Sequence, residues 1–201
     1  CVHCHTPAAS YFEPDLWDDL FLLKYDAAGV WQWTQRMGTD DEENGAAVLA
    51  DGTGGVFVTG HSYGSLDGQP HGGARDLILV RFDRDGNRIW TRQIGGTGPE
   101  WGNALLIDGQ GRILVIGGTA GDTDGHTSHG SYDMLVVAFD GEGNKLWSLQ
   151  PGTPALEWAN SGVIDVTGKL VLTGEGQGPF PGCTAAGNYD VFLARMPLQT
   201  R

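Results

Sequence analysis

Four similar segments recur along the chain at a constant spacing of 57 residues. Each begins with an aspartate and continues as a short run of aliphatic and aromatic residues. The repeated columns are Asp19, Asp76, Asp133 and Asp190; Trp33, Trp90 and Trp147; Gly38, Gly95 and Gly152; Glu43, Glu100 and Glu157; Asp51, Asp108 and Asp165; Gly60, Gly117 and Gly174. Self-similarity at one fixed period predicts a repeat architecture, in which each unit packs on its neighbours.

Each repeat unit reads as four short β-strands. In the second unit we expect strands at Leu77–Phe82, Arg88–Gln93, Ala104–Ile107 and Arg112–Gly117. β-Branched and aromatic residues fill these runs, and Gly, Asp and Asn, which favour turns, separate them. The 33 glycines among 201 residues fit a chain with many turns. The sequence therefore predicts an all-β, β-propeller-like fold with four strands in each unit.

The period divides the chain into an N-terminal arm and a repeat domain. The arm covers residues 1–18, and the repeat domain covers residues 19–201 as units 19–75, 76–132 and 133–189 with an extra strand at 190–196. Propellers typically close with about four to eight blades, so three units do not close a ring by themselves. The extra strand offers an edge on which another chain can pair. Three arrangements stay open: a piece of a larger propeller, a two-chain ring, and a head-to-tail assembly.

The repeat also resembles a known family. The second unit carries Asp76, Leu79-Val80-Arg81, Asp83, Gly86-Asn87, Trp90, Gly95-Gly96, Val115 and Gly117. This pattern resembles the bacterial secreted β-propeller (SBBP-type) repeats over about residues 19–196. The resemblance implies a propeller fold and a secreted protein, and it does not imply one activity, because propellers carry many functions.

The first five residues carry a motif with defined chemistry. Cys1 and Cys4, followed by His5, form the Cys-x-x-Cys-His sequence that attaches c-type haem. The two thiols form thioethers with the haem vinyl groups, and the histidine becomes the proximal iron ligand. Three other interpretations remain: a redox-active cysteine pair, half of a zinc site together with His3, and a lipid-modified first cysteine.

The second axial ligand of that haem decides between electron transfer and ligand chemistry. The distal ligand candidates are His3, His61, His71, His126 and His129, and none of the last four lies in a column that the repeat keeps. Met37, Met134 and Met196 are the thioether alternatives, and the last two occupy strand positions typical of a core. The third cysteine, Cys183, lies in a glycine-rich loop and receives no role.

The charge of the chain limits its partners. A formal net charge of −13 disfavours nucleic acids and anionic membrane surfaces, which require clustered Lys and Arg. The chain starts with Cys, which fits the removal of an export signal, and haem attachment to such motifs takes place outside the cytoplasm. We therefore expect a secreted or periplasmic protein of bacterial type.

These observations predict a monohaem c-type cytochrome that transfers electrons and is not an enzyme in its own right. Its partners would be a redox protein or neighbouring copies of itself, and an oligomer or a haem-linked filament is the assembled form. Two alternatives stay open. One is a non-enzymatic secreted binding or adhesion propeller with a structural cysteine pair, and the other is a fragment of a larger propeller oxidoreductase.

Overall fold

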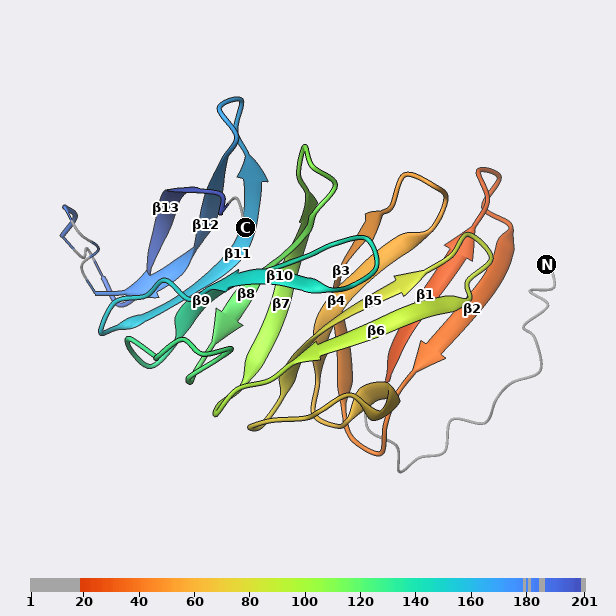
Figure 1. Cartoon of the computed structure of the whole chain (residues 1–201), viewed down its shortest axis with the longest axis horizontal. Coiled ribbons are helices and arrows are strands. Elements are labelled where there is room, and N and C mark those ends of the chain that lie inside the picture. The colour runs from red at the N-terminus through yellow and green to blue at the C-terminus, as the bar shows by residue number, and fades with distance from the viewer. Residues whose placement is uncertain (1–18, 179, 181, 185–186, 200–201) are drawn as a thin grey trace.

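The computed structural model describes residues 19–178, 180, 182–184 and 187–199. This part of the chain forms thirteen strands and one short 3₁₀ helix (Figure 1). The elements are β1 Leu20–Tyr25, β2 Trp31–Met37, β3 Glu43–Ala50, β4 Val56–Ser62, η1 Leu66–Gly68, β5 Asp76–Phe82, β6 Arg88–Ile94, β7 Glu100–Ile107, β8 Ile113–Thr119, β9 Asp133–Phe139, β10 Lys145–Leu149, β11 Leu156–Ile164, β12 Lys169–Gln177 and β13 Asp190–Pro197. The all-β prediction is confirmed. No helix in the described ranges has the length and apolar character to cross a membrane.

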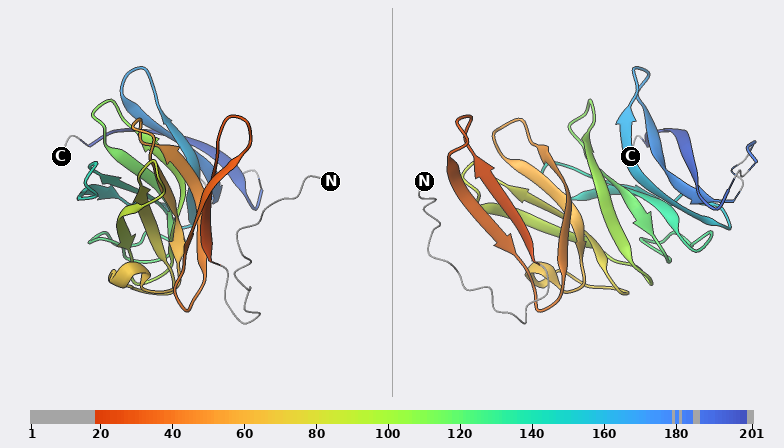
Figure 2. Two further views of the ribbon diagram at one scale, coloured as in Figure 1. Left: turned by 90° about the vertical axis from the view of Figure 1, so that its right-hand side faces the viewer. Right: turned by 180° about the vertical axis from the view of Figure 1, so that it is seen from behind.

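The strands form four antiparallel sheets in which sequence neighbours pair. The sheets are β1-β2, β3-β4-β5-β6, β7-β8-β9-β10 and β11-β12-β13. They lie in a row along the longest axis of the molecule, with β1-β2 at one end and β13 at the other, and the view from behind in Figure 2 shows the same order. In the second unit, all four expected strands are present, and β7 begins four residues earlier than we expected, at Glu100.

The sheets are shifted by half a unit relative to the sequence repeat. Strands β3 and β4 come from the first unit, whereas β5 and β6, which complete the same sheet, come from the second. The expected extra C-terminal strand, β13, pairs along its whole length with β12 of the preceding unit. A four-stranded sheet therefore joins two successive units, because the loops before Asp76 and Asp133 return the chain to the edge of the preceding hairpin.

Three apolar clusters lie between neighbouring sheets and hold the row together. One cluster joins β1 and β2 to the second sheet, one joins the second and third sheets, and one joins the third and fourth sheets. Alternate side chains of β9 serve two clusters. Leu135 and Val137 pack toward the second sheet, and Met134 and Val136 pack toward the fourth. Strands with apolar side chains on both faces are expected where a sheet is covered on both sides.

Each hairpin turn is fixed by an aspartate at its first position. Asp83 Oδ1 accepts hydrogen bonds from the backbone N–H groups of Asp85 and Asn87, at 2.9 and 2.8 Å. Gly86 adopts a φ of 86°, which favours glycine. Similar aspartate-to-backbone bonds recur at the equivalent turns, at Asp26, Asp51, Asp108, Asp140 and Asp165. The turn predicted at residues 85–87 is confirmed, and the repeated Asp and Gly columns of the sequence are explained in part by it.

These turn carboxylates make the fold acid-sensitive. Burial works to raise the pKa of Asp51, but hydrogen bonds from Thr53, Arg81 and Gly55 outweigh it and lower the pKa to about 2. The side-chain hydrogen bond from Asn87 likewise lowers the pKa of Asp83. An aspartate in the unfolded chain has a pKa of about 3.9. The ionised carboxylates therefore stabilise the fold above that pH, and this stabilisation is lost as the pH falls toward the lower pKa of the folded state.

We therefore expect the thermal unfolding midpoint to fall steeply between about pH 4 and pH 2. Asp51→Asn should lower the midpoint at pH 7 and reduce the steepness of the acid loss, because the substituted side chain does not titrate. Differential scanning calorimetry at a series of pH values measures both effects. Asp41→Asn, in an exposed loop, is the control, and an equal change in that variant would contradict the assignment to Asp51.

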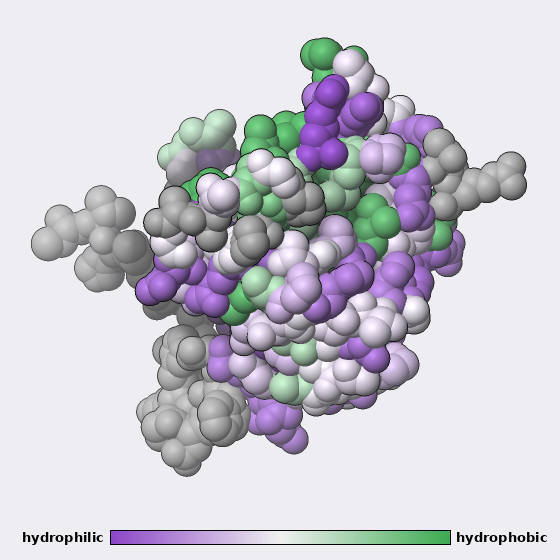
Figure 3. Space-filling model, turned by 90° about the vertical axis from the view of Figure 1, so that its left-hand side faces the viewer, coloured by the Kyte–Doolittle hydropathy of each residue, from purple (hydrophilic) through white to green (hydrophobic). Residues whose placement is uncertain are grey.

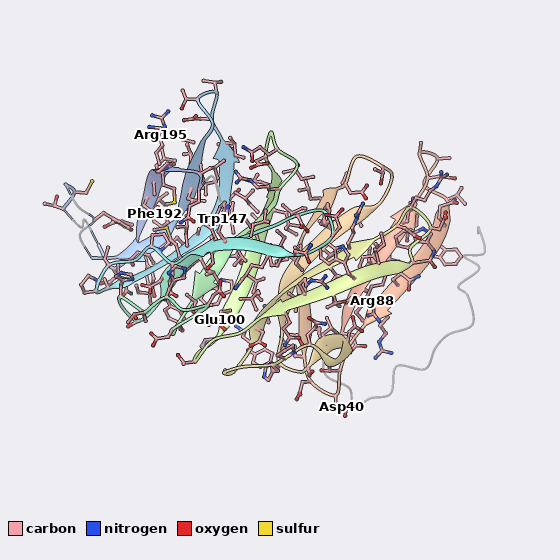
Figure 4. All side chains as sticks on the ribbon, in the orientation of Figure 1. Asp40, Arg88, Glu100, Trp147, Phe192 and Arg195 are labelled. Atoms are coloured by element: carbon pink, nitrogen blue, oxygen red, sulfur yellow. The ribbon has the colours of Figure 1, made fainter. Side chains whose placement is uncertain are left out.

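The repeated tryptophans pack against the turn of the following sheet. The Trp90 ring lies under Gly143, and its Nε1 donates a hydrogen bond to Gly141 O at 3.3 Å. Trp33 makes the same contacts with Gly86 and Arg84 O. Trp147 is buried in the cluster that also contains Phe192, and both residues are labelled in Figure 4. Trp147 is therefore a core residue, whereas Trp33 and Trp90 are half-buried and lie between neighbouring sheets.

Candidate functional site

The haem attachment motif lies outside the described residues. Cys1, Cys4 and His5, and the distal candidate His3, therefore remain predictions from the sequence alone. The other four histidine candidates are described, as are the three methionines. Met37 and Met134 are buried in apolar clusters, and Met196 packs against one. The core position expected for Met134 is confirmed, whereas Met196 is partly buried at the edge of the same cluster.

His71 is held by a buried carboxylate. It follows η1 in the loop between β4 and β5, and its Nδ1 lies 3.1 Å from Oδ2 of Asp76, a side chain with no exposed surface. The amide of Gln93 donates to the same oxygen at 2.8 Å, and Gly72 N donates to it at 3.0 Å. Nδ1 also lies 3.2 Å from Gln93 Nε2, and in the neutral Nδ1–H tautomer it donates to Asp76 and leaves the lone pair on Nε2.

The opposite ring nitrogen of His71 is available for a ligand. Within the described part of the chain, no residue hydrogen-bonds Nε2, and the imidazole is about one quarter exposed. The residue lines an open pocket formed by Pro70, His71, Gly72, Gln93, Ile94, Gly95 and Asp124. A histidine that ligates a metal usually donates its other N–H to a carboxylate or carbonyl, which fixes the tautomer and the ring orientation. The bond from His71 to Asp76 has this form.

The Nε2 atom of His126 is in hydrogen-bonding contact with Ser148, whereas the Nε2 atom of His71 has no such partner among the described residues. His126 Nε2 lies 3.0 Å from Ser148 Oγ and 3.2 Å from Ser148 O, and Ser148 Oγ donates to Asp124 at 2.5 Å. The three side chains of a hydrolase triad are present, but the carboxylate binds the serine and not the histidine. This order does not activate a serine nucleophile, which needs the histidine between the other two groups.

His61 and His129 differ from His71 for separate reasons. His61 lies half-buried in β4 with its ring against Tyr63, and burial, with the positive charge of Arg75, lowers its pKa to about 4. The imidazole is therefore neutral at pH 7, but the same Arg75 charge disfavours a cationic metal centre beside it. The His129 side chain is more than half exposed, and its Nδ1 is 3.7 Å from Asp133 Oδ2, beyond hydrogen-bonding distance.

Buried acids at the start of the third strand of each unit hold the neighbouring loops. Glu100, labelled in Figure 4, accepts hydrogen bonds from Thr119 Oγ1 and Thr123 Oγ1 at 2.7 and 2.8 Å. Burial raises its pKa, and these two bonds oppose the rise. Glu43 and Glu157 accept hydrogen bonds from both the backbone N–H and the hydroxyl of Thr39 and Thr153, respectively. The glutamate column is visible in the sequence but carries no motif that indicates a role, and in the structure its side chains hold the loops.

The partner of His71 was also missed. Asp76 was recognised as a repeat column, and its pairing with Gln93 recurs as Asp133 with Gln150. Gln93 and Gln150 are also 57 residues apart, in a column whose first member is Arg36. This column could have indicated that its side chains bind the repeated aspartates. In the described ranges, no group of three or more His, Cys, Asp or Glu side chains is arranged to hold a metal ion. The His71 site can therefore supply one ligand to a metal, and the remaining ligands must come from elsewhere.

No family model matches the chain. In an alignment 140 residues long that covers 64% of the chain, the chain is 29% identical to the regulatory protein FlaEY of Caulobacter vibrioides. The matched region makes up 15% of that protein, so the chain spans a small part of the length of this relative.

Cys183, the remaining cysteine, has an exposed side chain. It lies in the loop between β12 and β13, away from the pocket beside His71.

Proposed function

We propose that this protein is an extracytoplasmic monohaem c-type cytochrome that transfers electrons, with a body built of β-propeller-type repeats. The observation that carries the proposal is the sequence Cys1-Val2-His3-Cys4-His5. Cys1 and Cys4 would hold the haem through thioethers, and His5 would be the proximal iron ligand. Bound haem supplies a one-electron Fe(III)/Fe(II) couple, and the polypeptide sets its potential through the axial ligands and the surroundings.

The fold supports the propeller part of the proposal. The two complete sheets each have four strands in chain order, and neighbouring sheets pack face to face, as the blades of a propeller do. The similarity to SBBP-type repeats agrees with this arrangement and favours a secreted or periplasmic location. We propose that the four sheets are successive blades.

We further propose that His71 is the distal iron ligand. Its support is the orientation of the ring by Asp76, the open Nε2 and the adjoining pocket. His126 uses Nε2 for Ser148, His61 lies beside Arg75, and His129 is not oriented by a hydrogen bond to its ring. Two histidine ligands leave no open position on the iron, which favours electron transfer over ligand chemistry.

Covalent haem is the first test. The protein produced with a periplasmic haem attachment system should contain one haem for each 21.4 kDa chain and keep it through acid–acetone extraction. After unfolding, one thiol should react, that of Cys183, because the chain has three cysteines and the thioethers use two. The double variant Cys1→Ser, Cys4→Ser removes both thioether anchors and should release the haem into the extract.

A colourless protein would contradict the cytochrome and favour the second candidate, a secreted binding module with a structural cysteine pair. The observation in favour of that candidate is the similarity to FlaEY, whose name describes a regulatory protein. Counting the reactive thiols of the unfolded protein then gives the state of Cys1 and Cys4. Three reactive thiols indicate that both are free, and one reactive thiol indicates a Cys1–Cys4 disulfide.

A further inference from the structure

The repeat predicts which surfaces of the row are interfaces. The four strands β1, β5, β9 and β13 occupy the same column of the repeat and carry apolar residues on both faces. In β5 and β9, which have a sheet on each side, one face packs toward the preceding sheet and the other toward the following sheet. In β5 and β9, Leu77, Leu79, Met134 and Val136, which face the following sheet, are at most 5% exposed.

The first sheet exposes the face that, elsewhere in the row, packs on the preceding sheet. Phe21, Leu23 and Tyr25 of β1 are 66, 42 and 56% exposed. Their equivalents in β9 are Leu135, Val137 and Phe139, which are completely buried against the second sheet. We call Phe21, Leu23, Tyr25 and the exposed Trp31 of β2 the N-terminal face.

The last sheet exposes the opposite face. Val191 and Leu193 of β13 are 81 and 77% exposed, although their equivalents Met134 and Val136 are buried against the fourth sheet. Val163 of β11 is also exposed. We call Val191, Leu193 and Val163 the C-terminal face. Figure 3 looks at the molecule from this end and shows hydrophobic surface open to solvent between polar residues.

We propose that the N-terminal face of one copy of this chain binds the C-terminal face of a second copy. The two faces are the two halves of a joint that the chain already forms within itself. Between the second and third sheets, Leu77 and Leu79 share one cluster with Leu135, Val137 and Phe139. The C-terminal face supplies the first half of that joint, and the N-terminal face supplies the second. Exposed apolar patches of this kind mark interaction sites.

Charge agrees with this pairing. Arg36 lies opposite Phe21 in the β1-β2 ladder, and its side chain is half exposed beside Asp19. Glu175 lies opposite Val191 in the β12-β13 ladder and is exposed. Arg36 therefore lies beside the N-terminal face and Glu175 beside the C-terminal face, so the two faces carry side chains of opposite charge. Because the two faces differ, the contact is heterologous and can continue into a chain of copies.

The test uses one substitution on each face of the full chain. Light scattering coupled to gel filtration should give a mass for the unaltered protein that rises above 21.4 kDa as concentration increases. Phe21→Asp and Leu193→Asp should each stay monomeric, because each has one intact face. An equimolar mixture of the two variants should form a dimer and nothing larger, since the remaining faces are complementary. Both sites are exposed, so circular dichroism should show unchanged folds.

Ile89→Asp is the matched control, because Ile89 is half exposed on β6 and belongs to neither face. It should assemble like the unaltered protein. The proposal is overturned if the unaltered protein is monomeric at all concentrations, which would leave these faces to further repeats of a longer chain. It is also overturned if the two variants do not associate when mixed, or if either variant dimerises alone. None of these outcomes depends on whether the protein binds haem.

Discussion

Replacing Gly117 with alanine should lower the free energy of unfolding by about 3 kcal/mol, the upper end of the usual cost of overpacking. A Cβ atom at this position would lie 1.8 Å from the backbone oxygen of Trp101 on the neighbouring strand. The obstacle is main chain and not a flexible side chain, so relief requires β7 and β8 to separate. Urea unfolding with an unchanged m-value measures the loss.

The same contact recurs in each unit. Cβ atoms at Gly60 and Gly174 would lie 1.8 and 1.9 Å from the carbonyl oxygens of Asn44 and Trp158. At each site the register of the strand pair shifts by one residue, as between Gly102 and Ala104 opposite Gly117. The extra residue of such a bulge bends its strand and brings its carbonyl over the partner. Glycine is required because the bulge leaves no room for a side chain.

Gly109→Ala is the matched control for Gly117→Ala. No atom lies within 4 Å of a Cβ built at Gly109, and its φ is outside the left-handed region. Alanine there should leave stability unchanged or raise it by up to about 1 kcal/mol, because it restricts the unfolded chain. Equal losses in the two variants would show that the close approach at Gly117 does not set the stability.

The sequence shows that the repeated glycines matter, but it does not show why each position requires glycine. The constant spacing indicated that Gly60, Gly117 and Gly174 are structural, and Gly117 was expected at the end of the strand Arg112–Gly117, with no reason given for a glycine there. Turns do account for Gly86 and Gly143, which have positive φ. Gly117 instead lies inside β8, and a bulge on the partner strand cannot be recognised without knowing the strand register. The sequence also could not show which four consecutive strands form one sheet. A repeat has no unique starting point, so only the hydrogen-bond pairing of the strands defines where each sheet begins.

For the candidate site, the sequence supplied the residue types but not their ranking. Four histidines outside the arm appeared equivalent, since each occupies a loop or strand position that the repeat does not keep. The loop between β4 and β5 turns His71 back onto Asp76, whereas His129, next to the equivalent aspartate, points into solvent. That difference arises from loop conformation, which depends on many weak contacts and leaves no short motif.

His71→Ala should convert a low-spin haem spectrum into a high-spin one. Alanine removes the Nε2 that we assign to the iron, and the vacant axial position then takes a weak ligand or none. Carbon monoxide should bind the reduced variant readily and the unaltered protein slowly. Added imidazole should restore the low-spin spectrum of the variant, because it occupies the space and the bond that the side chain leaves. Absorption and electron paramagnetic resonance spectra follow each change.

His126→Ala is the control, since His126 lies in the corresponding loop of the next unit and its ring binds Ser148. That variant should keep the low-spin spectrum and should not respond to imidazole. Circular dichroism of both variants separates a lost ligand from a lost fold. A low-spin spectrum that survives in His71→Ala would exclude His71, and its loss in His61→Ala or His129→Ala would move the assignment to that residue. Survival in all four variants would leave His3, or a methionine, as the ligand, and the buried position of Met37 and Met134 then favours His3.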